Sequence, residues 1–143
     1  MTSAPHPLVK RAEAAQATVD RFLNQPFALG KRDCAQMLLF HLRSMGHVVK
    51  LAGVGDYKTV LGGKRALRRL GFASLTEAMD SRFPRITPAA AIVGDVIALA
   101  SGEALDALAI AVGNGRALGY HENAEGAVII QPRQTDTAWR VDP

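Results

Sequence analysis

The chain has 143 residues, a length that predicts one domain, 1–143, able to fold without a metal or disulfide staple. Cys34 is its single cysteine, so no internal disulfide can form, and we expect no metal or other cofactor. The N-terminus lacks a cationic start before an apolar run, and the most apolar stretch, 88–100, is too short to cross a bilayer. We therefore predict no signal peptide and no membrane segment.

The formal net charge of +4 is unevenly distributed along the chain. Residues 1–72 hold twelve Lys/Arg and four Asp/Glu, whereas residues 73–143 hold five and nine. This polarity suits docking to an acidic surface of nucleic acid, a wall polymer or another protein, although a solvated helical face has the same pattern. No aromatic residue interleaves the basic run at 64–69, which argues against a nucleic-acid partner.

The first part of the chain predicts two helices. Apolar residues at three- and four-residue spacing indicate an amphipathic helix over 7–23, and Pro26 begins a loop. Asp33 can cap a second, strongly apolar helix that starts at Cys34 and ends before Gly46. This second helix is expected to be buried centrally.

Shorter helices follow in the middle of the chain. The glycines within 53–63 predict a loop with at most one helical turn, and 64–70 should form a short basic helix. Ser74 and Glu77 form a capping-box pattern, which opens a helix to about Arg82.

The last third changes to short apolar or alternating runs, with a hairpin turn predicted at Gly113-Asn114-Gly115. The predicted strands are 96–100, 107–112, 116–121, 127–131 and 137–141. We therefore predict an α+β fold in which N-terminal helices pack on a C-terminal antiparallel meander. Its segments are an N-terminal helix (1–25), central and short helices with loops (26–93) and the sheet (94–143).

Cys34 is the first candidate for chemistry. A thiol at a helix N-terminus faces unpaired backbone N–H groups and the positive end of the helix dipole, and both favour the thiolate. A free thiol has a pKa of about 8.5, so this placement favours a nucleophile. The alternative is that Cys34 is a small buried apolar side chain, as most single cysteines are.

Three segments together resemble a known family. Phe27–Gly30 followed by Asp33-Cys34, then Gly94-Asp95-Val96, then 107–113 with an Asn-Gly turn, match the papain-like cell-wall cysteine peptidases of the NlpC type in order and spacing. The resemblance covers residues 26 to about 131. It implies a papain-like fold in which Cys34, the catalytic nucleophile of the family, opens a central helix against an antiparallel sheet.

The family's base is a histidine that opens the second strand, and the matching residue here is Ala107. Its third polar residue falls at Gly119. His41 lies two helical turns from Cys34, roughly 10 Å away and out of hydrogen-bond reach. His121 is the candidate substitute base, since it shares a strand face with position 119, although it is displaced by roughly 6.6 Å along the strand.

The segment around Tyr57 and the terminal Ala138-Trp139-Arg140 resemble a compact branch of this family encoded beside phage tail genes. That resemblance implies a virion protein of the tail tip, made in the host cytoplasm, in which a degenerate peptidase fold serves assembly or docking. Its partners would be hub, distal tail or central fibre proteins, with peptidoglycan as a further candidate.

Two other functions stay open. The chain could be an active endopeptidase or amidase that cleaves peptidoglycan stem peptides, with Cys34 as nucleophile and His121 or a residue of a partner chain as base. It could also be a cytoplasmic binding module that uses the basic segment 58–69, which salt-sensitive binding to nucleic acid would support. The missing family histidine favours the structural role.

Overall fold

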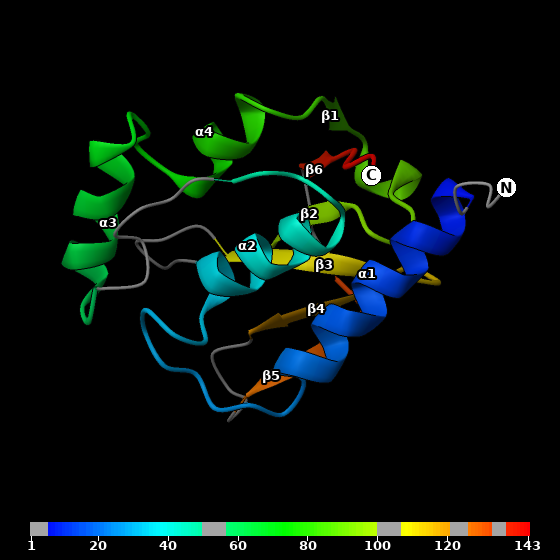
Figure 1. Ribbon diagram of the computed structural model, residues 1–143, viewed down its shortest axis with the longest axis horizontal. Helices are drawn as coiled ribbons and strands as arrows, with labels where there is room; N and C mark the ends of the chain where they lie inside the picture. Colours follow the sequence, from blue (N-terminus) through cyan, green and yellow to red (C-terminus); the bar gives the residue numbers. More distant parts are fainter. Residues whose placement is uncertain (1–5, 50–56, 100–106, 121–125, 133–136) are drawn as a thin grey trace, which may run out of the picture.

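The computed structural model describes residues 6–49, 57–99, 107–120, 126–132 and 137–143 (Figure 1). Its elements, in chain order, are α1 (Pro7–Phe22), α2 (Cys34–Ser44), α3 (Val60–Arg69), α4 (Leu75–Asp80), β1 (Arg85–Ile86), the 3-10 turn η1 (Pro88–Ala90), β2 (Val96–Leu99), β3 (Ala107–Gly113), β4 (Arg116–Tyr120), β5 (Ala127–Ile130) and β6 (Ala138–Trp139). Within these described ranges, no helix has the length and apolar character needed to cross a membrane.

The strands form one antiparallel sheet in the order β1-β6-β2-β3-β4-β5. Strands β2 to β5 follow one another as the predicted meander, and β6 returns from the C-terminus to lie between β1 and β2. Figure 1 shows α1 and α2 lying across one face of this sheet. The prediction of an α+β fold with an antiparallel meander is confirmed. Strand β1 has no counterpart in the sequence prediction, because two residues carry no periodic signal.

The β3–β4 hairpin turns where the sequence predicts it. Asn114 and Gly115 have φ angles of 57° and 72°. Positive φ at both central residues suits the right-handed twist of the flanking strands, and Asn and Gly reach it at low cost. The sheet is therefore fixed at this end by a local signal.

A buried ion pair joins α1 to the start of β2. Asp95 is 0% exposed, and its carboxylate accepts hydrogen bonds from the backbone N–H groups of Ile92 (3.0 Å) and Val141 (2.9 Å). The guanidinium of Arg11, itself 2% exposed, lies 2.9 Å from this carboxylate and 2.7 Å from Asp142. One arginine thus holds α1, β2 and the C-terminal segment together.

Helix α2 follows its prediction closely. Asp33 is the N-cap residue, and its side chain accepts the backbone N–H of Gln36 at 2.9 Å. Gly46 follows the end of the helix with a φ of 99°, a left-handed conformation that glycine adopts without strain. The helix is buried along most of its length, with Met37 and Leu42 in the main core.

Helix α3 begins at Val60, four residues earlier than predicted, so the end of the predicted 53–63 loop is helical. Thr59 caps it by accepting the backbone N–H of Gly62 at 3.0 Å. Gly62 and Gly63 lower helix propensity by about 1 kcal/mol each relative to alanine, which is why the sequence suggested a loop. Packing explains the glycine at position 62, where a Cβ would lie 3.2 Å from the Cβ of Tyr57.

Helix α4 opens with the predicted capping pattern, in which Ser74 accepts the backbone N–H of Glu77 at 3.1 Å. It ends at Asp80, two residues earlier than predicted. The indole N–H of the fully buried Trp139 donates to Asp80 at 2.9 Å, and Arg85 pairs with the same carboxylate at 2.7 Å. Arg85 and then Trp139 lower the pKa of Asp80 to about 2. Helix α4 is thereby tied to β6.

Candidate functional site

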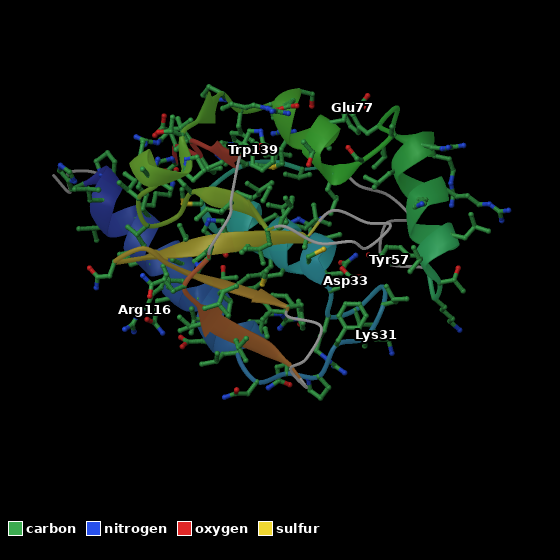
Figure 2. The ribbon with its side chains drawn as sticks, turned by 180° about the vertical axis from the view of Figure 1, so that it is seen from behind. Lys31, Asp33, Tyr57, Glu77, Arg116 and Trp139 are labelled. Atoms are coloured by element: carbon green, nitrogen blue, oxygen red, sulfur yellow. The ribbon has the colours of Figure 1, made fainter. Side chains whose placement is uncertain are left out.

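The loop before α2, the start of α2 and residue 57 meet through Asp33, as Figure 2 shows. One carboxylate oxygen caps α2, and the other accepts the backbone N–H of Gly30 at 2.8 Å and the hydroxyl of Tyr57. We call Asp33, Cys34, Tyr57 and Tyr120 the cysteine corner. Its acidic member is fully engaged in holding the loop and the helix start in place.

Cys34 is half-buried and packs against the main core. Burial raises the pKa of its thiol to about 11, and the negative charge of Asp33 adds to this rise. The backbone N–H of Leu108, and those of Cys34 and Ala35 at the helix start, lower the pKa but do not offset the burial. The backbone N–H groups at the helix start thus favour the thiolate, as expected, but burial outweighs them and the net shift is upward.

Tyr120 is the member of the corner that sequence reasoning missed. Its side chain packs against the core on the α2 side of the sheet, and its ring meets Phe27 edge-on, with centroids 5.5 Å apart. Burial and then the nearby negative charge of Asp33 raise the pKa of Tyr120 to about 12, so the phenol is neutral. Its hydroxyl oxygen is buried and has no hydrogen-bond partner among the described residues. Strand alternation from Leu118 was the signal that could have placed Tyr120 here.

The positions that match the family's base and third polar residue lie on the other face of the sheet. Ala107 pairs with Leu99 in the β2–β3 register, on the face of Ala109 rather than of Leu108. A Cβ at Gly119 would lie 3.2 Å from both Ala109 and Leu99, on that same face. A histidine at position 107 in this register would therefore point away from Cys34.

The sequence offered two other histidines as partners for Cys34, His121 and His41. His121, the candidate base, lies outside the described residues, so its relation to Cys34 stays a prediction. His41 is fully buried, with Nδ1 3.2 Å from the hydroxyl of Thr18 and Nε2 donating to the carbonyl of Gly94 at 2.8 Å. Burial is the main reason why the pKa of His41 is lowered. Both of its ring nitrogens are engaged away from Cys34, and its role is to join α1, α2 and the start of β2.

The chemistry that the corner offers is that of a neutral thiol beside two neutral phenols and a carboxylate that is already bonded. In the described part of the chain, no three His, Cys, Asp or Glu side chains gather as metal ligands. A separate cavity of about 280 Å³ lies between α2, α3 and α4. It is lined mainly by apolar side chains, among them Leu38, Leu39, Leu67, Phe72 and Met79. Among the described residues, neither place brings a histidine to the Cys34 thiol.

The chain belongs to the family described as "Domain of unknown function (DUF6950)", whose model matches residues 8–141. The match runs from the first turn of α1 to two residues beyond β6. No curated protein matches this chain. Membership of this family assigns no activity, so the chemistry of the cysteine corner carries the functional inference.

Proposed function

We propose that this member of the DUF6950 family is a structural protein of a phage tail tip, built on an NlpC-like fold that has lost peptidase activity. The observation that carries the loss of activity is geometric: Cys34 packs against the main core, while Ala107 and Gly119, which match the family's polar partners, lie on the other face of the sheet. Burial also raises the pKa of the Cys34 thiol to about 11. At neutral pH fewer than about one molecule in a thousand would carry a thiolate, which is the reactive form. A cysteine peptidase needs the opposite shift.

The surroundings of Cys34 support a structural reading of the corner. The carboxylate oxygens of Asp33 accept hydrogen bonds from Gly30, Gln36 and Tyr57, and these bonds fix the loop against the helix. The side of the sheet that faces α2 carries Leu108 next to Cys34, where a peptidase needs a polar partner. In this proposal, the cysteine corner serves packing and helix capping in place of catalysis.

The location in a phage tail rests on the resemblance of the Tyr57 segment and of Ala138-Trp139-Arg140 to the branch encoded beside tail genes. The uneven charge adds support, since a basic N-terminal half suits a fixed position among acidic neighbours. The partners we propose are other tail proteins at the hub, the distal tail or the central fibre. The protein would be made in the host cytoplasm and carried out within the virion.

The proposal is tested by complementation in a phage or prophage that carries the gene. Deleting the gene should abolish infective particles, and both the original chain and Cys34→Ser should restore them to similar titres. Tails from the complemented strains should contain the protein when purified particles are examined by mass spectrometry. Restoration by the original chain alone, with Cys34→Ser particles assembled but not infective, would contradict a silent role.

An active peptidoglycan-cleaving peptidase remains the second candidate, and one observation favours it. The backbone N–H groups of Leu108, Cys34 and Ala35 lower the pKa of the thiol, which is the direction that a cysteine nucleophile needs. In that case a base, from His121 or from a partner chain, would have to lower the pKa of the thiol. Release of stem-peptide fragments from peptidoglycan by the original chain, but not by Cys34→Ala, would establish this function.

A further inference from the structure

Helix α3 carries four cations within six residues, and they have no carboxylate partners in the described part of the chain. Lys64, Arg65, Arg68 and Arg69 lie on a helix with no acidic residue in its first turn. The ion pairs among the described residues are made elsewhere, by Arg11, Arg85 and Arg140. Arg65, Arg68 and Arg69 are exposed. The outer face of α3 is therefore a concentrated positive surface.

The opposite face of α3 packs against the rest of the fold, and this packing fixes the orientation of the helix. Gly63, Ala66 and Leu67 are buried, and Leu67 and Leu70 line the apolar cavity against α2 and α4. Figure 1 shows α3 at the end of the molecule that lies beside the start of α2, away from the sheet strands β1 and β6. The cations are thus held on a packed element and projected from one end of the fold.

The same outer face also exposes apolar side chains. Leu61 is 57% exposed and Val60 is 38% exposed. Leu61, Arg65 and Arg68 are spaced by four and three residues, so they form one stripe along the helix. We call Leu61, Arg65, Arg68 and Arg69 the α3 stripe. An apolar contact beside several arginines is typical of protein interfaces, whereas phosphate binding requires only the charges.

Two simpler explanations account for part of the α3 stripe. Arg68 and Arg69 lie in the last turn, where cations interact favourably with the negative end of the helix dipole. Solvated charges also keep a protein soluble. Neither effect requires Lys64 and Arg65 in the middle of the helix, and neither explains an exposed leucine at position 61.

We propose that the α3 stripe binds an acidic segment of a partner protein, which sets carboxylates against the arginines and an apolar side chain against Leu61. The inference rests on the proposed docking role, and it specifies the chemistry of the segment through which the partner binds. Arginine suits this contact because its planar guanidinium bonds a carboxylate through two parallel N–H groups. Nucleic acid is the alternative partner, and the absence of aromatic residues from 58–69 leaves no platform for base stacking.

The test measures binding of the full chain to three probes: poly-glutamate, a random copolymer of glutamate and leucine, and a 20-base-pair DNA duplex. The test variant is Arg65→Gln/Arg68→Gln/Arg69→Gln, which keeps good helix formers on α3. The control variant is Arg21→Gln/Lys31→Gln/Arg116→Gln, which removes three exposed cations from elsewhere and so has the same net charge. Circular dichroism confirms that both variants are folded.

The original chain should bind the copolymer more tightly than poly-glutamate or the duplex. The α3 variant should bind the copolymer at least about tenfold more weakly than the original chain does. The affinity of the control variant should change much less. Leu61→Gln should remove the preference for the copolymer and leave poly-glutamate binding unchanged. Tighter binding to the duplex, equal losses in both triple variants, or no copolymer binding would each overturn the inference. These results are independent of peptide hydrolysis and of complementation by Cys34→Ser, which test the proposed function itself.

Discussion

The hydroxyl of Tyr57 donates a hydrogen bond to the Asp33 carboxylate, and the two residues are separated by 24 positions in the chain. The same carboxylate caps α2 and holds Gly30 of the preceding loop. Burial and then the bond to Asp33 raise the pKa of Tyr57 far above its ordinary value, so the phenol donates throughout the physiological range. The start of α2 and the segment leading into α3 are therefore one hydrogen-bonded unit.

Tyr57→Phe should destabilise the fold by about 1–2 kcal/mol, because the Asp33 oxygen loses a donor in a buried position. Urea unfolding at pH 7 measures the change. Lys58→Ala, at the exposed neighbouring position, should stay within about 0.5 kcal/mol of the original chain. If the two variants unfold at the same urea concentration, the Tyr57–Asp33 bond contributes nothing to stability.

The two carboxylates that pair with Arg11 should differ sharply in their contribution to the stability of the fold. Asp95→Asn removes the buried charge and leaves Arg11 with only the exposed Asp142 as an ionic partner, which should cost about 3–5 kcal/mol. Asp142→Asn removes the other partner, but Asp142 is 79% exposed and should cost at most about 1 kcal/mol. Thermal or urea unfolding of both variants gives the comparison. Similar losses for the two would contradict a buried, structural role for the Arg11–Asp95 pair.

His41 should make the protein sensitive to mild acid. Burial lowers its pKa in the folded state, with a further decrease from Arg11 and an opposing effect from Asp95. The unfolded chain then binds more protons below pH of about 6.5, so the stability contributed by neutral His41 is present above that pH and lost as the pH falls. Urea unfolding at pH 7.5 and 5.5 should show a clear decrease for the original chain.

His41→Gln separates this effect from other titrating groups. The variant should be less stable than the original chain at pH 7.5, since it loses the contacts with Thr18 and Gly94, but it should lose less stability on acidification. His47→Gln is the matched control and should keep the pH dependence of the original chain. An unchanged pH dependence in His41→Gln would show that another group governs the acid response.

Local signals in the sequence predicted the elements that depend on local chemistry. Asp33 as a cap, Gly46 after α2 and the Asn114-Gly115 turn each act within a few residues, and the structure contains all three. The α3 start at Val60 was hidden because Gly62 and Gly63 disfavour a helix, and the packing of Gly62 against Tyr57 leaves no local signal in the sequence.

Contacts between distant segments could not be predicted. Arg11 and Asp95 are separated by 84 residues, and nothing in either segment indicates its partner. The place of β6 between β1 and β2 likewise depends on the whole sheet. The burial of Cys34 could not be predicted either. Its place at a helix start is a local feature, but its desolvation comes from the core around it.

The protonation state of Cys34 tests the central claim most directly. The rate of alkylation by iodoacetamide, followed from pH 6 to 11 with circular dichroism to verify folding, reports the pKa of the native thiol. Because that pKa is raised to about 11, the rate should stay low at neutral pH and climb between pH 9 and 11, with fold stability declining over the same interval. Urea-unfolded chain should react with the ordinary pKa of about 8.5. A native rate that is already at its plateau by pH 8 would mean that the folded chain stabilises a thiolate, and the account of a silent cysteine would be wrong.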